Sequence, residues 1–581
     1  MTDRLVTIRR GTTSQNLSMC EGQTALELLR EQGIRFSAPC GGKGTCGKCG
    51  LFVRDGEGLR FLLACKTPLV DGMILELGEE SPMLIEDAGL SLAGVFEPDA
   101  NAEGLGVAFD IGTTTLACRL FCLGGTATQG PRLLATATLV NPQAVFGADV
   151  ISRIDASMAG HLSAMEDAIA LALSQLALRL RAEAQVGAEA GGQAKGASGA
   201  QVGAETGGQA KGASEAQVGA EAQVGAERIT RITLAGNTVM QHIVCGLAPD
   251  SIGVAPFKPL SLFGELRPVK GLDVPAWLAP CVAGYVGGDI TCGILACGLY
   301  ASERPQLLID LGTNGEMALG DCTDIVSCAT AAGPVFEGAN VHFGMPALPG
   351  AIQAVREQDG ALEIEVIGGG EPIGICGTGL IDLIAVLLRR GIIDESGLLL
   401  GPDELSELPD LPENLRRRVG LEDGYPVFSL TDASDSHAPD HTATSDSTDP
   451  TPTPAPGRAL YLTQADVRNV QLAKSAIYSG VMVLLTDRGL AASDLDALFI
   501  AGGFGKRLSL ANAATVGLFP AELLSRARAV GNTSIEGASA ALLSQQARDT
   551  LQALTERCRY LELSVNANFN QFFTDYMTFG L

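Results

Sequence analysis

Residues 106–116 read GVAFDIGTTTL, and residues 307–319 read LLIDLGTNGEMAL. Both stretches share one design, in which an apolar strand ends at an aspartate, a turn rich in Gly, Thr and Asn follows, and a second strand leaves. Glycine lets backbone N–H groups approach phosphate oxygens, and Thr and Asn side chains add hydrogen-bond donors. Two such hairpins are predicted to hold one nucleotide from opposite sides.

The two aspartates, Asp110 and Asp310, are expected to hold Mg²⁺ directly or through water, because carboxylates are ligands that Mg²⁺ accepts. The predicted phosphate ligands lie in the two turns and are Gly112, Thr113, Thr114, Thr115, Gly312, Thr313, Asn314 and Gly315. The alternative is that both stretches are ordinary glycine hairpins of an α/β protein.

A third glycine turn follows another apolar strand, in the sequence LFIAGGFG at 498–505. The pair Gly502 and Gly503 would let an adenosine lie flat against the backbone. Further on, GNTSIEGASAALLS at 531–544 is a turn that opens a helix, whose N-terminus could support the nucleotide.

Strands alternate with long helices from residue 104 onward, which is typical of an α/β fold. Before that point, residues 1–83 indicate a small β-rich domain with one helix, and residues 84–103 a linker. We divide the remainder into a middle domain at 104–257, the first lobe, and a C-terminal domain at 258–581. A repeat of Ala, Gly, Gln and Val at 184–227 and a polar, Pro-rich stretch at 431–457 are predicted to be disordered inserts, because neither can build a core.

Four cysteines, Cys40, Cys46, Cys49 and Cys65, have the spacing C-x5-C-x2-C-x15-C. Four thiolates within a glycine-rich loop favour a [2Fe–2S] cluster. A zinc site is the alternative, but four-cysteine zinc sites favour two C-x2-C pairs, and only one is present. The segment resembles ferredoxin domains of the β-grasp fold, in the variant with five residues between the first two cysteines.

The net charge of −26 argues against nucleic acid or an anionic membrane as a main partner. No apolar run is long enough for a transmembrane helix, and the first residues have no apolar core of a signal peptide. We therefore expect a cytoplasmic protein with reduced thiols.

The two hairpins and the late glycine turn resemble the acetate and sugar kinase/Hsp70/actin superfamily. At family level, four segments resemble the reductive activators of corrinoid-dependent enzymes: NPQAVFGADVISRI at 141–154, LAGNTVMQHIVCG at 234–246, GYVGGDI at 284–290 and TQADVRNVQLAKSAIYSG at 463–480. The resemblance implies an N-terminal β-grasp [2Fe–2S] ferredoxin domain followed by a two-lobed, RNase H-like, actin-like ATPase.

The same resemblance implies a function. Members use ATP to drive an electron from the cluster to a Co(II) corrinoid, which restores Co(I). The implied cofactors are a [2Fe–2S] cluster, ATP and Mg²⁺. The implied partners are a corrinoid protein of a methyltransferase system and an upstream low-potential electron donor. Dimers occur in the family, so a homodimer is a further expectation.

Three other residues are candidates with open alternatives. Asp289 in GYVGGDI would orient the attacking water or would cap a helix. Asn237 in the GNT turn would contact phosphate or would only shape the turn. Lys474 lies on a helix that covers the adenine in the superfamily, or it faces solvent. His242 is expected to be a packed helical histidine rather than a ligand of cobalt.

Two other function classes share these modules. A small-molecule kinase would phosphorylate an acceptor and need no electron acceptor. An activator of radical dehydratases shares the actin-like ATPase but holds its cluster between subunits. A flavin-dependent ferredoxin reductase is disfavoured, because its R-x-Y-[ST] signature does not occur.

Overall fold

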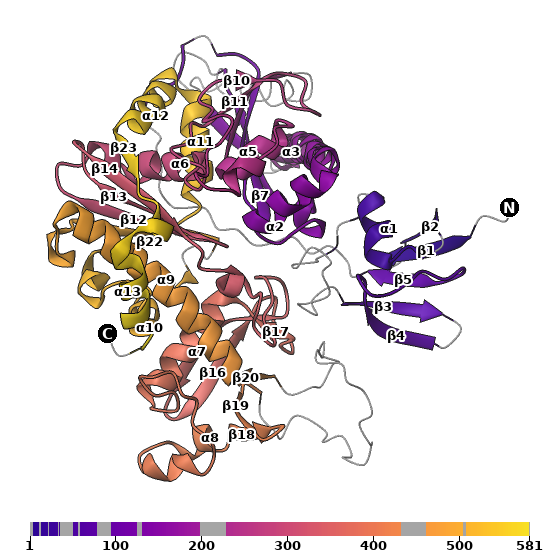
Figure 1. Cartoon of the computed structure of the whole chain (residues 1–581). Coiled ribbons are helices and arrows are strands. Elements are labelled where there is room, and N and C mark those ends of the chain that lie inside the picture. The colour runs from indigo at the N-terminus through magenta and orange to yellow at the C-terminus, as the bar shows by residue number, and fades with distance from the viewer. Residues whose placement is uncertain are drawn as a thin grey trace, which may run out of the picture.

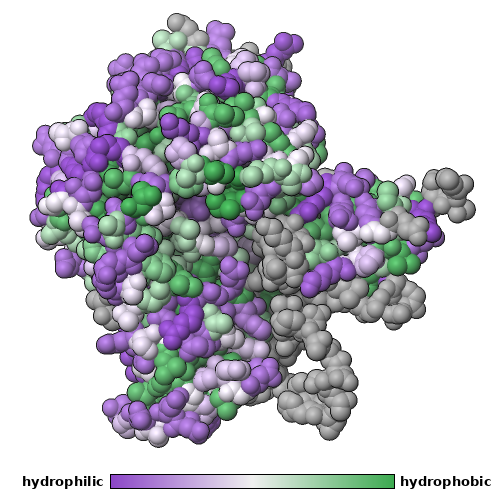
Figure 2. Space-filling view, in the orientation of Figure 1, coloured by the Kyte–Doolittle hydropathy of each residue, from purple (hydrophilic) through white to green (hydrophobic). Residues whose placement is uncertain are grey.

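The computed structural model describes residues 4–10, 13–20, 22–32, 34, 36, 50–55, 58–77, 95–100, 102–124, 130–197, 228–431, 460–503 and 507–579. A small N-terminal unit lies beside a larger body, on the side of helices α2 (Val150–Ala156) and α3 (Leu162–Ala197), as Figure 1 shows. The body carries two six-stranded sheets and two three-stranded sheets among the described residues. Apolar side chains on the visible face are scattered among polar ones (Figure 2).

The N-terminal unit is a five-stranded sheet of order β2-β1-β5-β3-β4 with one helix. Strand β1 pairs in parallel with β5 and antiparallel with β2, and β3 is antiparallel to both β5 and β4. The helix is stabilised by a capping box between Thr24 and Glu27, and it buries Leu26 and Leu29 against the sheet. The elements are β1 Leu5–Arg10, β2 Thr13–Ser18, α1 Ala25–Glu31, β3 Gly50–Asp55, β4 Gly58–Leu63 and β5 Ile74–Leu77.

The first large sheet has the order β10-β11-β9-β6-β7-β8. Its strands are β6 Leu105–Ile111, β7 Thr115–Cys122, β8 Arg132–Val140, β9 Ile229–Gly236, β10 Leu266–Arg267 and β11 Ala276–Leu278. Because β10 and β11 belong to this sheet, the first lobe of the structure extends past residue 257, where the sequence placed its end.

The second large sheet has the order β22-β21-β12-β13-β14-β23. Its strands are β12 Gln306–Leu311, β13 Gly315–Gly320, β14 Ile325–Thr330, β21 Ala497–Gly502, β22 Ala527–Gly531 and β23 Cys558–Tyr560. Strands β12, β13 and β14 form an antiparallel meander, and β21 lies parallel to β12. The first sheet repeats this plan, with the meander β6-β7-β8 and the parallel strand β9.

Alternation along the strands gives each sheet an outer and an inner face. In β6, Val107 and Phe109 point into the first lobe's own core, whereas Ala108 lies in a cluster shared with the second sheet. In β12, Ile309 points outward and Leu308 inward in the same way. Since Asp110 and Asp310 are two positions after Ala108 and Leu308, both carboxylates lie on the inner faces.

Two helices, α6 (Gly288–Cys297) and α11 (Thr533–Leu543), fill the layer between the two sheets. The two helices cross very closely. A Cβ on Gly537 of α11 would lie only 2.4 Å from the carbonyl oxygen of Cys292 of α6, so glycine is needed at this position. Helix α11 follows β22 of the second sheet along the chain, yet it packs on β6 and β9 of the first sheet. A buried ion pair between Arg119 of β7 and Glu536 of α11, 2.8 Å apart, strengthens this contact.

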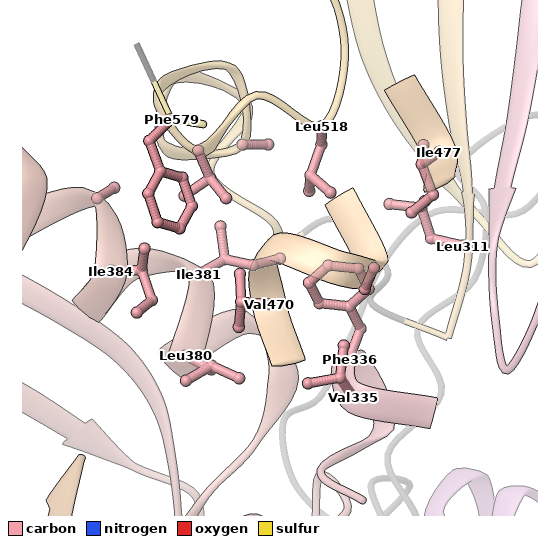
Figure 3. Close-up of a cluster of buried hydrophobic side chains, with 14 of the residues drawn as sticks. Leu311, Val335, Phe336, Leu380, Ile381, Ile384, Val470, Ile477, Leu518 and Phe579 are labelled. Carbon is pink, nitrogen blue, oxygen red and sulfur yellow. The ribbon is translucent and has the colours of Figure 1, made fainter. Parts of the chain in front are cut away.

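Other helices cover the outer faces. Helices α2, α3 and α5 (Thr238–Val244) cover the first sheet, and α9 (Gln464–Arg488) covers the second. Residues between β14 and α9 add two small sheets, helix α7 (Gly377–Arg389) and helix α8 (Glu413–Arg416). Figure 3 shows how Phe336, Ile381, Val470 and Phe579, from distant parts of the chain, share one apolar core. The small sheets comprise β15 Ala351–Gln358, β16 Ala361–Val366 and β17 Gly374–Ile375, and β18 Val419–Glu422, β19 Tyr425–Ser429 and β20 Tyr461–Thr463; the last helices are α10 Leu510–Val516, α12 Gln545–Arg557 and α13 Ala567–Asp575.

The predicted inserts and linker are described only in part. Helix α3 continues to Ala197, so the repeat begins as helix, while 198–227 and 432–459 lie outside the described residues. In the linker, Asp99 accepts a hydrogen bond from Gln545 N–H and pairs with Arg548 at 2.7 Å, which fixes the linker's end on α12. Among the described helices, none is long and apolar enough to cross a membrane.

Candidate nucleotide site

The two hairpin aspartates lie at corresponding positions of the two sheets. Asp110 is near the end of β6, where Ile111 pairs with Gly236 of β9, and Asp310 is near the end of β12, where Leu311 pairs with Gly502 of β21. Asp110 accepts hydrogen bonds from Asn532 at 2.6 Å and from Ser534 at 2.8 Å. These donors come from the start of α11, so the C-terminal helix completes the site of the first lobe.

The backbone of the first turn is held from one side. The carbonyls of Gly112 and Thr114 accept from Asn141, each at 2.8 Å, and the carbonyl of Thr113 accepts from the buried guanidinium of Arg153. In a trans peptide the C=O and the following N–H point in opposite directions. The N–H groups of Thr113 and Thr114 therefore point away from Asn141 and Arg153, an arrangement suited to binding an anion.

The second turn depends on glycine at Gly502. This residue has φ +118°, and a Cβ there would lie 2.3 Å from the carbonyl oxygen of Leu311 and 3.1 Å from Oδ1 of Asp310. No other residue type would fit without displacing β12. A Cβ on Gly503 would meet no atom of the described residues within 4 Å, so the backbone after the strand is open toward them. The predicted turn at 312–315 is closed by a bond from Gly312 N–H to the carbonyl of Asn314, 3.0 Å.

One carboxylate bridges the two hairpins. Glu337 Oε2 accepts from the hydroxyl of Thr114 at 2.7 Å and from the hydroxyl of Thr313 at 2.9 Å. Glu337 ends a short 3₁₀ helix, Pro334–Glu337, that follows β14. A single side chain therefore contacts both predicted phosphate-binding turns.

The remaining candidates lie at helix starts. The side chain of Asn237 accepts from Met240 N–H at 2.9 Å and so caps α5. It also donates to the hydroxyl of Thr113 at 3.1 Å, so Asn237 both shapes its own turn and contacts the first hairpin. Asp289 lies in the first turn of α6, whose N-cap is Gly287. The side chain of Asp289 is therefore not the cap of that helix.

The carboxylates of the site repel one another. Burial, together with the charges of Asp110 and other neighbours, raises the pKa of Asp289 to about 7 and that of Asp310 to about 8. Burial also raises the pKa of Asp110, although hydrogen bonds from Asn532 and Ser534 oppose the shift. A divalent cation would relieve this repulsion, so the donor set fits Mg²⁺. Among the described residues, however, no three His, Cys, Asp or Glu side chains stand close enough to hold a metal by themselves.

Two predicted residues lie elsewhere. Lys474 is buried, and its Nζ donates to the carbonyls of Tyr576, at 2.6 Å, and Thr578, so it anchors the C-terminal segment. Lys474 was predicted either to lie beside adenine or to face solvent, and the structure shows it in neither position. His242 is also buried, with Nδ1 2.7 Å from the carbonyl of Thr238, as expected for a packed histidine.

The cluster cysteines are only partly visible. Cys40, Cys46 and Cys49 lie outside the described residues, and Cys65 is half-buried in the turn after β4. Conversely, several residues that adjoin the hairpins were missed by sequence reasoning. They are Asn141, Arg153, Glu316 and Glu337. Asn532 and Ser534 lie in the stretch 531–544, which the sequence did indicate as a helix start beside the nucleotide, although not as partners of Asp110. The sequence GNT, which occurs at Gly236–Thr238 and again at Gly531–Thr533, could have singled out Asn532 within that stretch.

Two repeated lobes, with aspartate hairpins on facing sides and a helix pair between them, define an actin-like nucleotide-binding fold. Residues 304–413 and 439–580 match the C-terminal domain of RACo, described as the ASKHA domain, and residues 105–191 and 213–302 match the RACo middle region. The chain belongs to this family of reductive activators of corrinoid-dependent enzymes.

Three relatives agree with this assignment. The corrinoid activation enzyme RamQ of Eubacterium limosum is 28% identical over 94% of this chain and 95% of its own length. The [Co(II) methylated amine-specific corrinoid protein] reductase of Methanosarcina barkeri is 25% identical over 51% of this chain and 49% of its own. A solved structure, titled reductive activator for corrinoid,iron-sulfur protein, aligns over 99% of this chain and 98% of its own, with a TM-score of 0.64 and 26% identity.

Proposed function

We propose that this protein reduces the Co(II) corrinoid of a partner protein to Co(I), using ATP bound between its two lobes and an N-terminal [2Fe–2S] unit. The observation that carries the proposal is the placement of Asp110 and Asp310 on facing inner sides of two repeated lobes. The names of the relatives support the corrinoid substrate, and they do not favour a small-molecule kinase or a dehydratase activator.

The proposed roles at the nucleotide follow from the geometry. The amides of Thr113 and Thr114 and the turn 312–315 would bind phosphate oxygens, while Asn237 keeps the first turn in place. Asp110 and Asp310 would hold Mg²⁺ beside those phosphates, and the backbone of the Gly502–Gly503 turn, open at Gly503, would receive the adenosine. Asp289, in the first turn of α6, would orient the attacking water. Lys474 has no part in this scheme.

The N-terminal unit is proposed to be a β-grasp ferredoxin domain. Its strand order β2-β1-β5-β3-β4 with one helix suits that fold, and four cysteine thiols are a suitable donor set for a [2Fe–2S] cluster. Cys40, Cys46, Cys49 and Cys65 would hold it, and when bound the cluster supplies one-electron chemistry at low potential. The chain's own contribution is to present this unit beside the first lobe (Figure 1).

ATP is needed if electron delivery to the corrinoid is uphill. Each 100 mV of unfavourable potential costs about 2.3 kcal/mol for one electron. A nucleotide that favours one arrangement of the lobes can supply this free energy by stabilising the reactive complex with the partner. The excess of acidic residues, which gives a net charge of −26, favours a partner that docks through a basic surface. A low-potential donor must reduce the N-terminal unit in turn.

The test follows Co(II) to Co(I) conversion by absorbance in a corrinoid protein of a methyltransferase system. A low-potential chemical donor supplies electrons, with and without Mg-ATP. Wild type should reduce the corrinoid only with ATP, and Asp310→Asn should lose this dependence together with most of the rate. The exposed Asp410 offers a matched control, Asp410→Asn, that should behave as wild type. Reduction at the wild-type rate by Asp310→Asn would refute the proposal.

A further inference from the structure

The N-terminal unit touches the first lobe at the segment that also holds the first phosphate turn. The segment is Asn141–Gly147, which contains the short 3₁₀ helix Pro142–Val145. Arg30, in the last turn of α1, donates from Nε to the carbonyl of Val145 at 2.5 Å. Its guanidinium also lies over the ring of Phe146, 5.9 Å from the centroid. A cation over an aromatic ring is attracted to it, and more strongly where water is excluded.

A second contact lies next to the first. Phe36 packs against both the core of the N-terminal unit and the core of the first lobe. The two units do not fill the space between them, because a cavity of about 860 Å³ separates α1 from α3 and is lined by Arg30, Ile34, Phe146 and Leu171 among others. Among the described residues of the two units, the docking contact therefore depends on few side chains.

The segment Asn141–Gly147 also lies beside the first phosphate turn, and residues in and next to it donate hydrogen bonds to the carbonyls of that turn. Asn141 bonds the carbonyls of Gly112 and Thr114, and Arg153 bonds the carbonyl of Thr113. Arg153 also donates to the carbonyl of Gly147 at 3.1 Å and to Gln143 at 3.3 Å. Only four residues separate Asn141, which holds the turn, from Phe146, which meets Arg30.

We propose that Asn141–Gly147 is a docking site for the N-terminal unit whose strength increases when a nucleotide occupies the first hairpin, with Arg30 and Phe36 as the positioning residues. The proposal rests on the nucleotide function given above. An anion at the amides of Thr113 and Thr114 polarises those peptide groups, and this strengthens the bonds that their carbonyl partners accept. The segment is then ordered, and Val145 and Phe146 are held in place for Arg30.

Amide hydrogen exchange of the full chain, followed by mass spectrometry, tests the proposal. With Mg²⁺ and a non-hydrolysable ATP analogue, wild type should show slower exchange in 110–116 and also, by roughly threefold or more, in α1. Arg30→Met keeps the length of the stem but removes the guanidinium. It should retain the response of 110–116 and lose the response of α1. Arg54→Met, on the exposed side of β3, is the matched control and should behave as wild type.

The outcomes separate the two proposals. If 110–116 responds and α1 does not, the docking proposal is wrong while the nucleotide site stands. An Arg30→Met protein in which α1 still responds overturns it as well. Phe146→Leu, which keeps an apolar side chain but removes the ring, should weaken the α1 response as Arg30→Met does; an unchanged response also counts against the docking contact. If neither region responds to nucleotide in wild type, the proposed ATP site itself is wrong.

Discussion

Removing the carboxylate of Glu536 should strongly destabilise the two-lobed body. The side chains of Arg119 of β7 and Glu536 of α11 are 6% and 10% exposed, and they pair at 2.8 Å. With a charge separation of about 4 Å and an effective dielectric constant of about 20, their attraction is about 4 kcal/mol. Glu536→Gln removes this negative charge from beside the buried guanidinium, and breaking a buried pair in this way typically costs about 3–5 kcal/mol.

The single tryptophan offers a local assay. Trp277 lies in β11 of the first sheet and packs against the cluster between the sheets, so its fluorescence should report unfolding of this region. For a cooperative unit of roughly 400 residues, the entropy of unfolding is about 0.8 kcal/mol/K, so a loss of 4 kcal/mol lowers Tm by about 5 °C. The double variant Arg119→Met/Glu536→Leu removes both charges and should lie within about 1 kcal/mol of wild type.

Two results would refute this reasoning. A Glu536→Gln protein that melts within about 1 °C of wild type would mean that the pair contributes little. A double variant as unstable as the single one would mean that packing, rather than the loss of the carboxylate charge beside Arg119, accounts for the lower stability.

Three further predictions concern other parts of the chain. Burial lowers the pKa of Lys474 from 10.5 to about 8. Between these values the unfolded state binds more protons than the folded state, so stability should rise with pH from about 8 to 10.5. Thermal melts of Lys474→Met should lack this rise, and pH profiles of wild type and variant that run parallel would contradict the prediction. Gly537→Ala would place a Cβ 2.4 Å from the Cys292 carbonyl and should cost about 1–3 kcal/mol by denaturant titration, whereas Gly420→Ala, which meets nothing within 4 Å, should change stability by less than about 1 kcal/mol. Cys65→Ser should lower the bound iron of anaerobically purified protein from about two per chain while leaving ATP binding intact, and full iron content would show that Cys65 is not a ligand.

The hairpin aspartates could be found from sequence because their signal is local. An apolar strand that ends in D-x-G-T fixes both the turn and, by alternation, the face on which Asp110 and Asp310 lie. Glu337 gave no such signal, because it reaches the site only after the chain leaves β14, and its partners Thr114 and Thr313 are 223 and 24 residues away. A bridge of this kind depends on the packing of two lobes.

Long-range packing also explains the other differences. Lys474 lies on a helix whose pattern allowed an exposed or ligand-facing side chain, but the last residues of the chain cover it. Strands β10 and β11 have two and three residues, too short for an alternation pattern to reveal. For that reason the sequence pattern did not predict that the first lobe extends past residue 257.

The crossing of α6 and α11 has a consequence for how this gene could be divided. A first fragment ending near residue 303 would contain β6 and β9 but lack α11, the helix that covers their inner face. It would expose Ala108, Ala235 and the apolar side of α6 to water. The second fragment would carry α11 without β6, β9 and α6, against which this helix packs. Neither half would be soluble and complete alone, so fission of the gene would be tolerated only where both products are made together and reassemble around each other.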